Sequence, residues 1–264
     1  MKNFHGLEKI GREVRRNVIE MSYHSQTGET GSALCIADIL VVLYFSILNV
    51  FPQEPRHLER DRFILSKGHG AAALYATLAL RGFYPESLLK KYKVDGGIFH
   101  GHPCRAAASG IEASTGSLGH GLSIGAGMGL ALRNKKNVGV WVLLGDGECN
   151  EGMIWEAAQF IGTRQLSNVK VLIDRNRWQG FGPLKDTNNM FFEDQWKAFG
   201  FDVDVCDGHN YQELLSAFLH AKNSNKPSVV IADTIAGKGI PQIEDTLAAH
   251  YFVAKKENLI PIHL

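Results

Sequence analysis

The chain has 264 residues, of which 45% are hydrophobic and 21% are charged. These values are typical of a globular protein and exclude a chain that is mainly disordered, collagen-like or coiled-coil. Lys and Arg total 28 against 27 Asp and Glu, and this balance argues against nucleic acid or an anionic membrane as the main partner.

The first third of the chain is predicted to be mainly helical. Apolar residues at helical spacing predict a helix over 6–23. Segment 33–50 is apolar and, at 18 residues, long enough to approach the transmembrane threshold. Asp38 would place a costly charge inside a membrane span, so we expect a buried core helix rather than a membrane or interfacial segment. A short strand over 62–65 and a helix over 71–80 follow.

The remainder alternates between strands and helices. A long segment rich in Gly, His, Ser and Ala, 95–117, is predicted to be a functional loop. Near-continuous apolar runs predict strands buried on both faces, and the expected order is helix 119–132, strand 138–144, helix 151–164, strand 169–173, helix 212–222 and strand 228–233. This alternation predicts an α/β fold, a parallel sheet with helices on both faces. No linker is visible, so we expect one domain over 1–264.

Cysteine usage and the N-terminus bear on location. Cys35, Cys104, Cys149 and Cys206 form no C-x-x-C pair, so neither a zinc cage nor a redox dithiol is indicated. Unpaired cysteines are typical of a reducing cytosol. The N-terminus shows no apolar segment of a signal peptide. We therefore expect a cytoplasmic protein.

Two polar side chains follow neighbouring predicted strands. Asp146 lies in Gly-Asp-Gly directly after one strand, and Asn176 follows the next strand 30 residues later. The carboxyl ends of parallel strands share one edge of a sheet, so both side chains should meet there. Carboxylate and amide oxygens suit Mg²⁺ or Ca²⁺, and the flanking glycines let a phosphate approach the backbone. The pattern predicts a metal–diphosphate site.

Two simpler interpretations compete with this site, and one other residue cluster could bind a metal. Gly-Asp-Gly could be only a strand-to-helix turn with an Asp cap. A dinucleotide site requires G-x-G-x-x-G after a strand, and the run 145–150 lacks the third glycine. His100, His102 and Cys104 alternate and could face one metal, but no fourth ligand stands at a usable spacing.

The chain resembles the transketolase family. The resemblance rests on Asp146, Asn176 and motifs that occur in family order: LSKGH at 65–69, GHP at 101–103, STGSLGHG at 114–121, GDGECNEG at 145–152 and GKG at 237–239. They match the amino-terminal, diphosphate-binding half of a transketolase. The resemblance implies the thiamine diphosphate-binding fold, with thiamine diphosphate and Mg²⁺ as cofactors. It also implies a separate carboxy-terminal subunit carrying the pyrimidine-binding domain, in an α2β2 heterotetramer.

The resemblance also implies roles for individual residues. The metal ligands are Asp146, Asn176 and the backbone carbonyl of Trp178. Positions that match cofactor contacts are Ser32, His69, Gly116, Ser117, Leu118, Gly147, Glu151, Asn176, Lys238 and His250. The predicted catalytic set, lining the channel to the reactive carbon of the cofactor, is His69, His102, His250 and Glu29.

Three departures from the family pattern concern the substrate end. Glu29 stands where the family has a His, Arg175 precedes Asn176, and Ala236 replaces a Lys. An ionised Glu only accepts hydrogen bonds, so we expect an ordinary pentulose phosphate to be a poor donor. The expected reaction is transfer of a two-carbon ketol unit from a ketose to an aldehyde, active only with the partner chain. The alternatives are a 2-oxo acid decarboxylase or dehydrogenase type of subunit, and a non-catalytic partner subunit.

Overall fold

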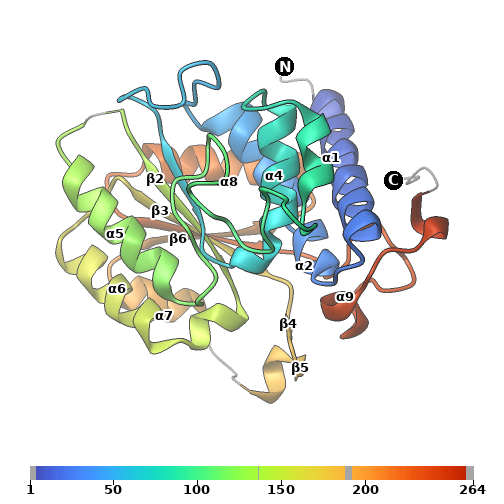
Figure 1. Cartoon of the computed structure of the whole chain (residues 1–264). Coiled ribbons are helices and arrows are strands. Elements are labelled where there is room, and N and C mark those ends of the chain that lie inside the picture. The colour runs from blue at the N-terminus through green and yellow to red at the C-terminus, as the bar shows by residue number, and fades with distance from the viewer. Residues whose placement is uncertain (1–3, 136, 188–191, 260–264) are drawn as a thin grey trace.

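The protein is built on one five-stranded sheet. The computed structural model describes residues 4–135, 137–187 and 192–259. Residues 1–3, at the N-terminus where no signal peptide is expected, lie outside the described residues. All neighbouring strands of the sheet are parallel, in the order β1-β2-β3-β7-β6. Their bounds are β1 (Arg62–Leu65), β2 (Val140–Gly145), β3 (Val169–Arg175), β6 (Asp202–Asp207) and β7 (Ser228–Asp233). The predicted α/β class is confirmed (Figure 1).

The central strands are buried on both faces, as their apolar runs predict. In β2, Val140, Val142 and Leu144 belong to one hydrophobic cluster, whereas Trp141 and Leu143 belong to another. Side chains alternate across a strand with a period of two, so the two clusters are the two sides of the sheet. An uninterrupted apolar strand therefore serves both cores at once.

Helices cover both faces (Figure 1). The clusters assign one face to α1 (Phe4–Ser25), α2 (Thr30–Leu34), α3 (Ala37–Val42), α4 (Ala71–Leu80) and α8 (Tyr211–Asn223). The other face carries α5 (His120–Leu132), α6 (Gly152–Thr163) and α7 (Phe192–Ala198). The small residues of α5 let it approach the sheet closely, because a Cβ on Gly125 would stand 2.5 Å from Cγ2 of Val142.

The long apolar segment is part of the core. It forms α2, α3 and one π-helical stretch, η1 (Leu43–Ile47), rather than the single helix expected over 33–50. By length and composition Thr30–Ile47 could cross a membrane, but 89% of it is buried inside the fold. This burial agrees with the prediction of a core segment.

Several elements were not predicted from the sequence, among them α7, a short helix α9 (Ala248–Tyr251) and three strands. The edge strand β6 contains Asp202, Asp204 and Asp207, and most of its residues are partly or fully exposed. Aspartate is depleted in strands, so no apolar run marks this one. A short hairpin of β4 (Trp178–Gln179) and β5 (Gly182–Pro183) follows β3.

Candidate active site

The structure brings the predicted metal ligands to one edge of the sheet. In the parallel pairing of β2 with β3, Gly145 lies opposite Asp174. Asp146 and Asn176 therefore leave neighbouring strands at the same edge, which confirms the predicted adjacency. Both residues are buried: 2% of the surface of Asp146 and 7% of the surface of Asn176 are exposed.

Asp146 is a buried carboxylate held by backbone groups. Its Oδ1 accepts a hydrogen bond from the N–H of Gly147 at 2.8 Å, and its Oδ2 accepts one from the N–H of Arg177 at 2.6 Å. Within the part of the chain that the structure describes, no basic side chain forms an ion pair with it. Burial, and then the nearby Asp174 carboxylate, raises the pKa of Asp146 to about 7. A divalent cation would supply the positively charged partner that neutralises this buried carboxylate.

Asp174 is the centre of a fully buried polar network. It accepts hydrogen bonds from the ammonium of Lys67, the hydroxyl of Thr234, the thiol of Cys35 at 3.1 Å and the amide Nδ2 of Asn176 at 3.1 Å. Burial by itself would raise the pKa of Asp174, but Lys67 and these hydrogen bonds hold it below its ordinary value. The network joins three strand ends and the segment between α2 and α3.

This network orients Asn176. Because its Nδ2 donates to Asp174, its Oδ1 faces the other way and accepts the N–H of Trp178 at 2.9 Å. An amide oxygen has two lone pairs and so retains one for a cation. Arg177 adopts a left-handed backbone, with φ of 69°, and the indole of Trp178 donates to Asp245 at 2.8 Å. The turn after β3 therefore wraps around Asp146.

The donor set fits a hard divalent cation that shares its shell with another ligand. One carboxylate and one amide oxygen are too few to fill the coordination of Mg²⁺, which commonly takes its remaining ligands from phosphate and water. Among the described residues, no group of three or more His, Cys, Asp or Glu side chains could hold a metal. The alternative site at His100, His102 and Cys104 is therefore not formed.

Two other loops meet beside this edge. A Cβ on Gly68 would stand 3.0 Å from the N of Gly116 and 3.1 Å from Cδ2 of His102, so the 66–70 and 114–118 loops are in direct contact. The hydroxyl of Thr115 donates to the carbonyl of Leu65, the last residue of β1, at 2.7 Å. The backbone of the predicted cofactor-binding stretch is thereby fixed to the end of β1.

Glu148 ties these loops together and was missed by the sequence analysis. Its carboxylate accepts the N–H of Gly119 at 2.8 Å, the N–H of Gly145 at 3.1 Å and the hydroxyl of Ser66. Burial raises its pKa above the ordinary value. The available signal was an acidic residue placed two positions after Asp146, within the turn that follows a buried strand.

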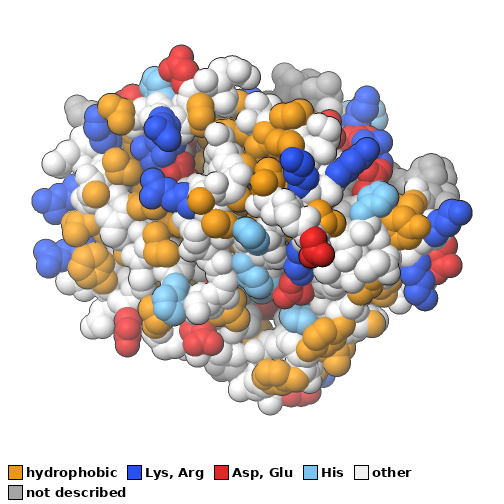
Figure 2. All heavy atoms as spheres, in the orientation of Figure 1, with side chains coloured by type: hydrophobic (Ala, Val, Ile, Leu, Met, Phe, Trp, Pro, Cys, Tyr) orange, Lys and Arg blue, Asp and Glu red, His pale blue; other side chains and the backbone are white. Residues whose placement is uncertain are grey.

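Three predicted histidines lie near one another. The rings of His69 and His250 are 6.1 Å apart, and a Cβ on Gly68, the residue before His69, would stand 3.1 Å from Cδ2 of His102. Burial, followed by the charge of Lys67, lowers the pKa of His69 to about 3, and the same two causes lower the pKa of His250. His69 is therefore a neutral imidazole at neutral pH. Figure 2 shows histidine side chains gathered in the middle of one face.

The approach of distant segments places His250 here. A Cβ on Gly28 would stand 3.1 Å from the carbonyl oxygen of Tyr251, so the segment before α2 packs directly on α9 (Ala248–Tyr251). Ser32 lies buried in α2, and its carbonyl oxygen is 3.5 Å from the Cβ position of Gly70.

Glu29 has a partner that the sequence analysis did not identify. Its Oε2 lies 3.4 Å from Nζ of Lys93, and both side chains are partly buried. The sequence signal was weak, because Lys93 is one of three lysines just before the glycine-rich segment.

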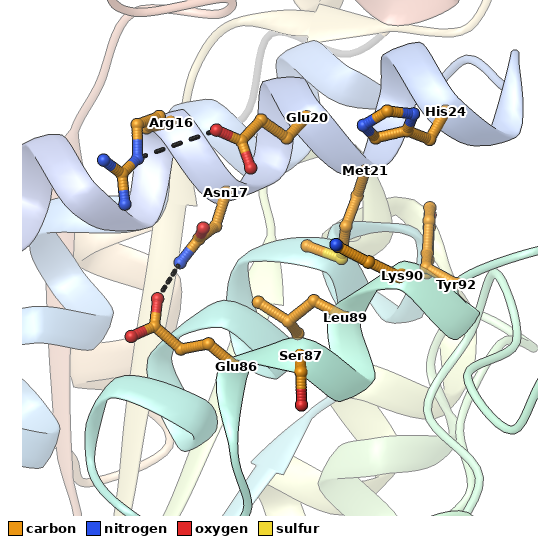
Figure 3. A pocket seen from close by; sticks show the side chains of 10 residues that line it. All are labelled: Arg16, Asn17, Glu20, Met21, His24, Glu86, Ser87, Leu89, Lys90 and Tyr92. Atoms are coloured by element: carbon orange, nitrogen blue, oxygen red, sulfur yellow. Dashed lines mark hydrogen bonds and ion pairs between the residues drawn. The ribbon is translucent and has the colours of Figure 1, made fainter.

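A separate hollow extends from Tyr92, which precedes Lys93, along α1. It has a volume of about 260 Å³ and lies between α1 and η3 (Glu86–Lys91), where Asn17 donates to Glu86 at 3.0 Å (Figure 3). None of its lining residues belongs to the predicted site.

The family assignment follows from comparison with known proteins. The family described as "Transketolase, thiamine diphosphate binding domain" matches residues 8–260. The chain belongs to the transketolase family. The matching part is the thiamine diphosphate-binding domain of that family, and the predicted family and fold are confirmed.

Transketolase relatives of two lengths match. The 6-deoxy-6-sulfo-D-fructose transketolase subunit SqwG of Clostridium sp. (strain MSTE9) is 40% identical over 248 residues, 92% of this chain and 90% of that protein. An apulose-4-phosphate transketolase subunit of Phocaeicola vulgatus is 37% identical, over 95% of this chain and 90% of that protein. The solved transketolase of Leishmania mexicana has a TM-score of 0.91 at 28% identity, covering 97% of this chain. The chain spans 40% of the length of that transketolase.

The remaining residues predicted from the transketolase motifs lie less centrally. The ammonium of Lys238 is 3.9 Å from the carboxylate of Glu244. In the same loop, the N–H of Gly237 donates a hydrogen bond to the carbonyl of Gly31 in α2. Glu151 is exposed, and its Cβ is 3.0 Å from the Cβ position of Gly119. Ser117 is exposed, whereas Gly147 and Leu118 are half-buried. The roles of these residues stay predictions.

Proposed function

We propose that this chain is the diphosphate-binding subunit of a two-chain enzyme that moves a two-carbon ketol unit from a ketose donor to an aldehyde acceptor. The observation that carries the proposal is the buried pair of Asp146 and Asn176 at adjacent strand ends, in a chain that covers nine-tenths of relatives named as transketolase subunits. The proposal treats 1–264 as one domain. The partner is a separate chain with the pyrimidine-binding domain, in an α2β2 assembly.

The chain's own oxygens would hold Mg²⁺. Asp146 and Asn176 supply two side-chain ligands, and the backbone carbonyl of Trp178 supplies a third. Gly147 and the Gly116 to Leu118 stretch would offer backbone to the diphosphate, with the remaining contacts from Ser32, His69, Lys238 and His250. When bound, thiamine diphosphate supplies the electron sink for making and breaking the carbon–carbon bond.

The histidines would act on the substrate oxygens. A neutral imidazole donates from one ring nitrogen and accepts at the other. His69, held neutral, could therefore bind a ketose hydroxyl and take up or return its proton. His102 and His250 lie close enough to share this task, which makes the three residues the proposed acid–base set.

The metal-site part of the proposal is tested by binding. Calorimetric titration of thiamine diphosphate, with Mg²⁺ present, should show that Asp146→Ala abolishes binding in the assembled enzyme. Asp95→Ala, which removes an exposed carboxylate, is the matched control and should bind like the natural protein. Unchanged affinity in Asp146→Ala would refute the metal assignment.

Activity tests separate the proposed reaction from its alternatives. The purified chain should show no turnover, and addition of the partner chain should restore it. The donor panel should include a pentulose phosphate, 6-deoxy-6-sulfo-D-fructose and apulose 4-phosphate. Carbon dioxide release from a 2-oxo acid would identify the decarboxylase type. Failure to bind the cofactor with any partner would identify a non-catalytic subunit.

A further inference from the structure

The ion pair of Glu29 and Lys93 lies beside the histidines and has no role in the proposed binding of the metal or the diphosphate. Glu29 and Lys93 are 64 residues apart in the chain, and their charged ends lie 3.4 Å apart. Their side chains are 33% and 24% exposed. Both residues have a left-handed backbone, with φ of 67° and 48°. That conformation is uncommon for side chains with a Cβ, and such strain concentrates at functional sites.

Lys93 reaches this position because Gly101, which has no side chain, leaves space for the lysine stem. A Cβ on Gly101 would stand 2.9 Å from Nζ of Lys93 and still closer to its stem. Gly101 immediately precedes His102, so the lysine stem runs beside the histidine cluster. The backbone N–H of Lys93 donates to the carbonyl of Phe99 at 2.8 Å, and its ammonium lies 5.9 Å from the ring centroid of Tyr92. The stem is therefore confined on several sides.

Glu29 lies next to Lys93, on the His250 side of the same cluster. It precedes α2, where the chain packs on α9, and its charge acts on His250. His250 is next to His69. A continuous set of neighbours therefore runs from His69 through His250, Glu29 and Lys93 to His102. The pair completes the rim around the groups proposed to handle the substrate.

We propose that Glu29 and Lys93 together bind two neighbouring oxygens of the ketose donor. Glu29 accepts a hydrogen bond from one hydroxyl, and Lys93 donates to the adjacent hydroxyl or carbonyl oxygen. The proposal rests on the proposed function and names the part of the donor that this rim recognises. Lys93 supplies the donor groups that a carboxylate alone lacks.

The charge of the pair decides which part of the substrate it binds. Carboxylate and ammonium cancel, so the pair has no net charge to attract a phosphate or sulfonate. An anion that approached Lys93 would also meet Glu29. The pair therefore suits the neutral polyol portion, and an anionic group of the donor is bound elsewhere in the assembled enzyme. With Lys93 present, the charge of Glu29 does not by itself exclude a pentulose phosphate.

The test uses the assembled two-chain enzyme with Mg²⁺ and thiamine diphosphate. Lys93→Met should raise the KM of the ketose donor about tenfold or more, as expected for the loss of a hydrogen bond from a charged group. The affinity for thiamine diphosphate and the KM of the aldehyde acceptor should stay within about twofold. Lys93→Arg should recover most of the loss. Lys91→Met removes an exposed lysine two residues away and should change nothing.

A binding measurement removes the dependence on turnover. The sugar alcohol corresponding to the donor should bind by calorimetry to the natural enzyme and about tenfold more weakly to Lys93→Met. Equal binding and equal donor KM would overturn the proposal. A parallel fall in cofactor affinity and thermal stability would also overturn it, since the pair would then only fasten the loop. Failure of the natural enzyme to use any ketose would instead refute the proposed function.

Discussion

The Lys67–Asp174 ion pair beneath the metal site makes a quantitative prediction about stability. Lys67 is 1% exposed and Asp174 is 0% exposed, and their charged ends are in direct contact. Lys67→Met would leave the Asp174 carboxylate buried with only the neutral donors of Thr234, Cys35 and Asn176. Removing one partner of a buried pair destabilises by about 3–5 kcal/mol. Because three neutral donors remain, we expect a loss near the lower limit, about 3 kcal/mol.

The measurement is equilibrium urea unfolding of the purified chain followed by far-ultraviolet circular dichroism. A double-mutant cycle with Asp174→Asn isolates the pair, because the double variant contains neither buried charge. We expect the double variant to be more stable than the sum of the single losses by about 2 kcal/mol or more. Lys135→Met removes a lysine that is 48% exposed and pairs with Glu59, and should change the unfolding free energy by less than about 0.5 kcal/mol.

Two results would refute this reasoning. A loss below about 1 kcal/mol in Lys67→Met would mean that the carboxylate is not held in a desolvated position. Additive losses in the cycle would mean that the two side chains do not interact energetically. A confirmed coupling should also appear in function, because Asp174 orients the amide of Asn176.

Further predictions concern the site itself. Asp146→Asn keeps the side-chain size but removes the charge, so calorimetry should show cofactor affinity at least about tenfold lower, and an unaltered affinity would contradict the metal site. Glu29→His should raise kcat/KM for a standard ketose phosphate and lower it for the native donor; an unchanged ratio would remove Glu29 from the specificity residues. Because His69 has a folded pKa of about 3, only the unfolded chain takes up its proton below about pH 6.5. The unfolding free energy should therefore fall as pH decreases from about 6.5 toward 3, and less steeply in His69→Gln; equal slopes would refute the buried neutral state.

Local sequence patterns were sufficient for the central elements of the fold. The expected ranges 62–65, 71–80 and 228–233 coincide with β1, α4 and β7. Turn residues bound all three apolar runs, and the two strands, β1 and β7, need such runs because they are buried on both faces of the sheet. The adjacency of Asp146 and Asn176 was also predictable, because one strand–helix–strand crossover separates them and parallel neighbours end at one edge.

Charged partners at long range were not predictable. Lys67 meets Asp174 across 107 positions, and Ser66 meets Glu148 across 82. The hydrophobic periodicity of a segment does not show which buried donor will face which buried acceptor. That pairing depends on how whole elements pack. The edge strand β6 was missed for a related reason, because its exposed aspartates carry no apolar signal.

The sequence by itself was sufficient to predict the α/β class, to locate the motifs shared with transketolases and to place two polar residues at strand ends. Each of these features depends on the residues of a short segment. Only the tertiary structure decided that Asp174 orients Asn176 and that Glu29 has Lys93 as its partner. Hydrogen bonds and ion pairs of this kind arise between loops that the sheet brings together. Their geometry is a property of the assembled edge and of no single segment.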